Sequence, residues 1–189
     1  MYLYQPCLLS LALLSWAMDG PGSKVHRRMI LFSLLSLALS EVEAGGTYLS
    51  LYPAALLLPV PFLLSMEDKE AWPEVLAAAF FGGMLCWRAA DAWPLLPGVM
   101  LLCGMLLPMP ACLLCRGEAE TLLSICLGSL CFELFFCLRE YVLFSFCVVR
   151  LGSREGLSLG ALSLLLYQLF AWIYPAVSHG RKDALSMEF

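Results

Sequence analysis

The stretch Thr121–Val149, TLLSICLGSLCFELFFCLREYVLFSFCVV, is apolar apart from three charged residues, and it decides the fold. A membrane-spanning helix needs about 20 consecutive apolar residues to cross the hydrocarbon core of a bilayer. This stretch is too long for one upright helix and too short for two full ones. We therefore predict one long, tilted membrane-spanning helix here, with one end emerging from the bilayer.

The rest of the chain repeats this pattern of apolar blocks separated by short polar gaps. Hydrophobic residues make up 61% of the chain and charged residues 14%, whereas soluble domains have about 45–50% and about 25%. Mean hydropathy is +0.84. The blocks are continuous and do not alternate residue by residue, which favours helices over a closed barrel. The composition predicts an all-α, polytopic transmembrane bundle of six to seven spans.

The polar gaps set the predicted boundaries of the spans. The blocks cover about 2–18, 29–40, 47–65, 75–87, 93–115, 121–149 and 157–177. The third block contains Pro53, Pro59 and Pro61, which predict a kinked helix because proline removes a backbone donor. We expect a single transmembrane domain, 1–178, followed by a polar C-terminal tail, 179–189.

Lysine and arginine residues predict the orientation of the bundle, because they are enriched in cytoplasmic loops. Seven spans with the N-terminus outside would place most basic loop residues in the cytoplasm: Lys24, Arg27, Arg28, Lys69, Arg116, Arg181 and Lys182. The reverse orientation would place Arg88, Arg150 and Arg154 there. We expect a multi-pass protein of the plasma membrane with its C-terminus in the cytoplasm. The bilayer is the expected partner, and nothing in the sequence points to nucleic acid.

The nine cysteines do not predict a disulfide framework, because most lie inside apolar blocks, where cysteine behaves as a small hydrophobe. Cys112 and Cys115 form a CxxC pair. A structural zinc site needs four ligands, and no second pair or nearby histidine accompanies this one. We predict neither a metal nor another cofactor.

Carboxylates beside the ends of two spans are candidate catalytic residues. Asp19 follows the first span, and Asp68 and Glu70 follow the third, so the predicted orientation puts all three on one side of the membrane. Two adjacent carboxylates can share a proton and activate water for peptide hydrolysis. The alternative is structural, with Asp19 as a turn residue and the other two in a solvated loop. Asp91 and Glu155 have a similar spacing but fall on the outer side.

Two segments carry a resemblance to a known family. LLSWAMDGPGSKVHRRMILF (13–32) and EVLAAAFFGGMLCWRAADAW (74–93) are similar in layout to the compact prepilin peptidases, membrane aspartyl proteases that cut the leaders of type IV pilin precursors at the cytoplasmic face. The resemblance covers about Leu8–Gly117. It implies that Asp19 is the first catalytic aspartate and that Asp68 or Glu70 replaces the second, since SMEDKEAWPEV (65–75) stands where the family has GxGD. A membrane-inserted precursor peptide would be the substrate.

Glu133 lies within an apolar block, where an ionisable side chain is costly and normally faces the bundle interior or a water-filled cavity. Helical spacing puts Cys126, Ser129, Cys137 and Glu140 on the same face. This polar stripe predicts either a protonated, hydrogen-bonded interior glutamate or a path for protons or ions. The second possibility gives an alternative function, a non-catalytic membrane transport or assembly subunit with a polar path around Glu133.

Overall fold

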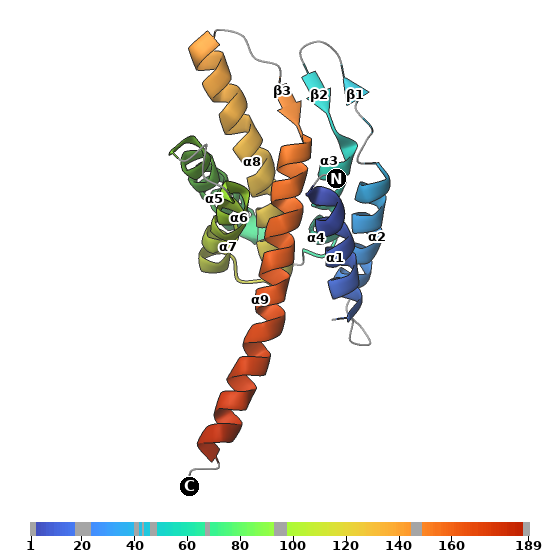
Figure 1. Cartoon of the computed structure of the whole chain (residues 1–189), viewed down its shortest axis with the longest axis vertical. Helices are drawn as coiled ribbons and strands as arrows, with labels where there is room; N and C mark the ends of the chain where they lie inside the picture. Colours follow the sequence, from blue (N-terminus) through green and yellow to red (C-terminus); the bar gives the residue numbers. More distant parts are fainter. Residues whose placement is uncertain are drawn as a thin grey trace.

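The chain folds into a mainly helical bundle with one long helix extending beyond it (Figure 1). The computed structural model describes residues 3–17, 24–39, 42, 44–45, 49–66, 69–92, 98–144 and 149–186, with side chains in the last helix up to residue 173. Asp19 and Asp68 lie outside the described residues.

Most predicted spans correspond to helices. The helices are α1 (Tyr4–Ala17), α2 (Lys24–Ala38), α3 (Pro53–Leu57), α4 (Val60–Leu63), α5 (Trp72–Ala92), α6 (Val99–Leu106), α7 (Pro108–Leu114), α8 (Glu118–Phe144) and α9 (Arg154–Ser186), with a short 3-10 turn η1 (Lys69–Ala71) before α5. The strands are β1 (Ala44–Gly45), β2 (Leu49–Leu51) and β3 (Val149–Leu151). The block 121–149 forms one long helix, α8, as far as Phe144, as predicted, whereas Val149 belongs to β3.

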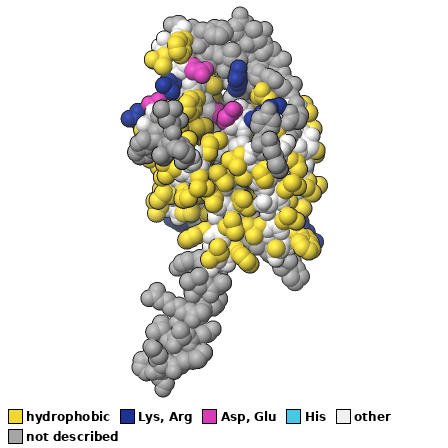
Figure 2. All heavy atoms as spheres, viewed as in Figure 1, with side chains coloured by type: hydrophobic (Ala, Val, Ile, Leu, Met, Phe, Trp, Pro, Cys, Tyr) yellow, Lys and Arg dark blue, Asp and Glu magenta, His cyan; other side chains and the backbone are white. Residues whose placement is uncertain are grey.

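Among the residues that the structure describes, three helices are long and apolar enough to cross a membrane: α5, α8 and the Arg154–Ile173 part of α9. Figure 2 shows apolar side chains covering the middle of one face, with many of its charged side chains toward one end. The helices α1 and α2 have 14 and 15 residues, fewer than the about 20 of an upright span. The fold is that of a helical protein compatible with membrane insertion, and a total of six to seven spans stays a prediction.

Small residues bring α5 and α8 into close contact, as expected for helices packed inside a membrane. A Cβ atom added to Gly83 would lie 2.9 Å from the Gly128 carbonyl oxygen and 2.9 Å from the Phe132 nitrogen. A Cβ on Gly128 would lie 3.3 Å from the Ala79 carbonyl oxygen. The backbones of α5 and α8 are therefore in contact at the positions where each helix contains a glycine.

A buried polar cluster joins α9 to the α1–α2 hairpin. Gln168 Nε2 donates to the Met29 sulfur at 3.0 Å, and Ser15 Oγ donates to Gln168 Oε1 at 3.3 Å. All three side chains are buried. The amide of Gln168 therefore finds partners inside the apolar core, as a buried polar group requires.

A small sheet, which the sequence analysis did not predict, accompanies the helices. Strand β2 pairs antiparallel with β1 and parallel with β3. The third predicted span is accordingly not one kinked helix, but β2 followed by α3 and α4. Tyr52, just before Pro53, has an extended backbone (φ −108°, ψ 103°), the conformation that a following proline favours. Pro53 then begins α3, where its missing N–H is not needed.

The bundle has two distinct ends. The sheet end carries the three strands and an ion pair of 3.0 Å between Arg139 of α8 and Asp91 of α5. At the opposite end, Arg28 of α2 donates to the Leu64 carbonyl oxygen and to Ser65 Oγ, both at 2.9 Å. This contact holds the start of α2 beside the end of α4. The start of α2 and the end of α4 therefore lie on the same side of the bundle.

Candidate functional site

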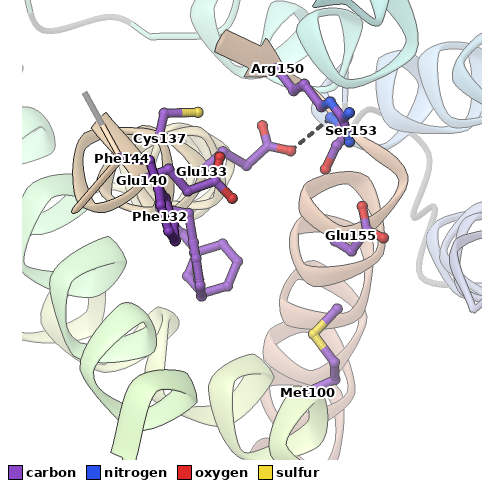
Figure 3. Close-up of a pocket in the computed structure, with 10 residues that line it drawn as sticks. Met100, Phe132, Glu133, Cys137, Glu140, Phe144, Arg150, Ser153 and Glu155 are labelled. Carbon is purple, nitrogen blue, oxygen red and sulfur yellow. Dashed lines mark hydrogen bonds between the residues drawn. The ribbon is translucent and has the colours of Figure 1, made fainter. Parts of the chain in front are cut away.

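A cavity of about 680 Å³ lies at the sheet end, between the C-terminal half of α8, the start of α9 and α6 (Figure 3). We call it the Glu133 cavity. Its lining residues are Met100, Phe132, Glu133, Phe136, Cys137, Glu140, Phe144, Arg150, Ser153 and Glu155. Figure 3 shows Glu133 and Glu140 on α8 and Ser153 and Glu155 at the start of α9, on two sides of the same space.

The carboxylate of Glu133 caps the start of α9. The Gly152 N–H donates to Oε2 at 2.6 Å, and the Ser153 N–H donates to Oε1 at 2.7 Å. The residue is 6% exposed. Backbone N–H groups at a helix start lack intrahelical partners and carry partial positive charge, so they bind a carboxylate well. The expectation that Glu133 faces the interior and is hydrogen-bonded is confirmed.

The segment GSREG (152–156) is shaped around this carboxylate. Gly152 has φ +80°, and a Cβ there would lie 2.8 Å from the Tyr52 carbonyl oxygen. A Cβ on Gly156 would overlap the Glu133 carboxylate itself. Ser153 Oγ accepts the Gly156 N–H at 3.3 Å, the usual bond of a helix N-cap. Glycine at 156 lets the backbone of α9 approach Glu133, and glycine at 152 allows the positive φ and the close contact with Tyr52.

The rest of the cavity combines an apolar floor with charged groups. Phe132 and Phe136 meet edge to face, with ring centroids 4.9 Å apart. Glu140, Glu155 and Arg150 are exposed. Three of the described lining residues are glutamates and one is an arginine. The cavity suits a molecule with an apolar body and a charged group.

The predicted polar stripe on α8 divides at Glu133. Toward the sheet end, Cys137 and Glu140 line the cavity. In the other direction, Cys126 and Ser129 are buried, and Ser129 Oγ donates to the Cys126 carbonyl oxygen at 2.8 Å. A Cβ on Gly160 of α9 would lie 2.9 Å from Ser129 Oγ, so this part of the stripe is packed against α9. A polar path beyond Glu133 stays a prediction.

Of the predicted catalytic residues, the structure describes Glu70, which belongs to the opposite end. Glu70 lies in η1, is exposed, and lines a pocket of about 240 Å³ with Glu74, Arg116 and Glu120. The pairing of Glu70 or Asp68 with Asp19 stays a prediction, because both aspartates are outside the described part of the chain.

The remaining candidates are separated. Asp91 pairs with Arg139, whereas Glu155 lines the Glu133 cavity. Among the described residues, no group of three or more histidine, cysteine, aspartate or glutamate side chains could hold a metal ion.

Glu133 was predictable from the sequence as a candidate site residue, but its partners Gly152 and Ser153 were not. The sequence does hint at a helix start here, since Gly152 and Gly156 flank a serine just before an apolar block. Nothing in the spacing links that segment to a residue on α8. No known protein family, curated protein or solved structure matches the chain.

Proposed function

We propose that this chain is a multi-pass membrane protein that binds an amphipathic small molecule in the Glu133 cavity, as a non-catalytic transport or assembly subunit. The observation that carries the proposal is the cavity itself. Its volume of about 680 Å³ falls within the about 300–1,000 Å³ of small-molecule sites, which combine apolar walls with a few placed polar groups. The hydrogen bonds from Gly152 and Ser153 to Glu133 hold the start of α9, which forms one wall of the cavity, in place.

The surroundings of the cavity favour a ligand that arrives from the bilayer. Both α8 and the start of α9, which supply most of its lining, are candidate spans. Leu138, Val142 and Phe144, on α8 near the cavity, are more than half exposed. Large exposed apolar side chains on a candidate span suit contact with lipid, so a molecule dissolved in the bilayer would reach the cavity without crossing water.

We place the sheet end outside the plasma membrane and the opposite end in the cytoplasm. Arg28 supports this orientation, because its hydrogen bonds to Leu64 and Ser65 attach the basic start of α2 to the end of α4. Arg116 lies at that end too, beside Glu70 and Glu74. An excess of lysine and arginine marks the cytoplasmic side, and the loops predicted on this side contain more of them than the loops predicted on the sheet side. The Glu133 cavity would then lie near the outer face.

Native mass spectrometry of the purified protein tests the binding function. We expect the wild type to retain a small amphipathic molecule from the membrane when it is released from detergent. Cys137→Trp should lose that molecule, because Cys137 lines the cavity and indole would fill it. The matched control is Leu138→Trp, at a neighbouring position with 58% exposure, which should keep it. An empty wild type, or equal retention in both variants, would contradict the proposal.

A peptidase acting at the opposite end is a second candidate function. The contact from Arg28 to Leu64 and Ser65 favours it, because it attaches helices adjoining the Asp19 and Asp68 segments to one another. If the chain cuts leader peptides, Asp19→Asn should abolish cleavage of a membrane-inserted precursor at unchanged protein level, since an amide cannot take up the proton. Asp68→Asn and Glu70→Gln, made separately, would identify the partner. If Asp19→Asn leaves cleavage unchanged, the peptidase function with Asp19 as a catalytic residue is wrong.

A further inference from the structure

The charges that line the Glu133 cavity do not balance. Glu133 faces the Gly152 and Ser153 amides, while Glu140 and Glu155 add two carboxylates at exposed positions. Arg150 is the arginine among the described lining residues. Arg139, next to Glu140 in the sequence, is held in its ion pair with Asp91. The cavity therefore carries more negative than positive charge.

The aromatic side chains that line the cavity also favour a positively charged ligand. The faces of aromatic rings are electron-rich and attract cations that come within about 6 Å of the ring centre. Phe132 and Phe136 form a contact pair in the floor, and Phe144 lies one helical turn beyond Glu140 on α8. Charges also interact more strongly beside an apolar wall than in water. An anion would meet unfavourable charge here, and a neutral molecule would gain nothing from it.

We propose that the Glu133 cavity selects organic cations with apolar substituents, and this inference rests on the proposed binding function. The positive group faces Glu140 on α8 and Glu155 on α9, which Figure 3 shows on two sides of the cavity. The apolar body lies against Phe132, Phe136 and Met100. Glu133 acts as a positioning residue, because its carboxylate holds the start of α9, and with it Glu155, in place.

A pair of probes matched in shape and opposite in charge tests the selection. Tetraphenylphosphonium and tetraphenylborate carry the same four phenyl groups around a central atom. Binding of each radiolabelled ion to the full-length protein is measured by equilibrium dialysis in a non-ionic detergent, and uptake by empty micelles is subtracted. We expect the wild type to bind the phosphonium at least tenfold more tightly than the borate. Glu140→Gln with Glu155→Gln should reduce phosphonium binding at least tenfold.

The control is Glu74→Gln with Glu118→Gln, which makes the same change in net charge at exposed positions of the opposite end. It should leave phosphonium binding unchanged. Equal binding of both ions by the wild type, tighter binding of the borate, or equal loss in both double variants overturns the inference.

The two proposals fail in different ways. If neither ion binds while native mass spectrometry still shows a molecule that Cys137→Trp removes, the choice of cation is wrong and the binding function stands. If neither ion binds and the wild type retains no molecule, both proposals fall.

Discussion

Both carboxylate oxygens of Glu133 accept backbone N–H groups at the start of α9, so the residue works as a helix cap as well as a wall of the cavity. Glu133→Gln would replace one acceptor by an NH₂ group that faces a backbone donor. Leaving a buried donor without a partner costs about 1–3 kcal/mol. We expect lower stability in reversible unfolding by denaturant in detergent.

The control for this prediction is Glu140→Gln, at an exposed position in the same cavity, which should leave stability unchanged. Equal stability of wild type and Glu133→Gln would contradict capping by a carboxylate and favour the protonated glutamate instead.

Gly156 gives an independent test of the same contact, because a methyl group there would overlap the Glu133 carboxylate. Gly156→Ala should therefore lower stability, and much of the loss should disappear when Glu133→Ala is already present. Such non-additivity is the sign of a direct contact. Thermal unfolding of the two single variants and the double variant measures it. Gly160→Ala, whose added Cβ would meet Ser129, should combine additively with Glu133→Ala, and additivity for Gly156→Ala too would refute the contact.

At the scale of the helices, packing of α5 on α8 depends on the backbone contact at Gly83. An added side chain would place Cβ 2.8 Å from the Cβ of Cys131, so Gly83→Val must push the helices apart. We expect a marked loss of monodisperse protein in size-exclusion chromatography. Leu76→Val, at a position with 54% exposure on α5, should behave as wild type. Normal yield of Gly83→Val would show that the helices do not meet as closely as described.

The helix α8 was predictable because its apolar block, 121–149, is long and free of proline. The strands were not, because β1 and β2 have two and three residues, too few for an alternating pattern to show. The same limit applies to the site. Periodicity on α8 placed Glu133 and Glu140 on one face, but the partners of Glu133 lie 19 and 20 residues away, across a connection that no helical period describes.

At the scale of the molecule, the two ends should face different compartments. Val42 lies between α2 and the sheet and is exposed, and Glu118 is exposed at the start of α8, at the opposite end. In a background cleared of native cysteine, Val42→Cys should react with a membrane-impermeant maleimide in intact cells. Glu118→Cys should react after the membrane is opened. Reaction of both from the same side would contradict the orientation.

The most direct test of the binding site is an experimental map of the protein in lipid nanodiscs. We expect density for an amphipathic molecule in the Glu133 cavity, in contact with Phe132 and between Glu140 and Glu155. We also expect the Glu133 carboxylate to lie within hydrogen-bond distance of the Gly152 and Ser153 nitrogens. A cavity filled by the protein's own side chains, or a Glu133 carboxylate turned away from the start of α9, would contradict these expectations.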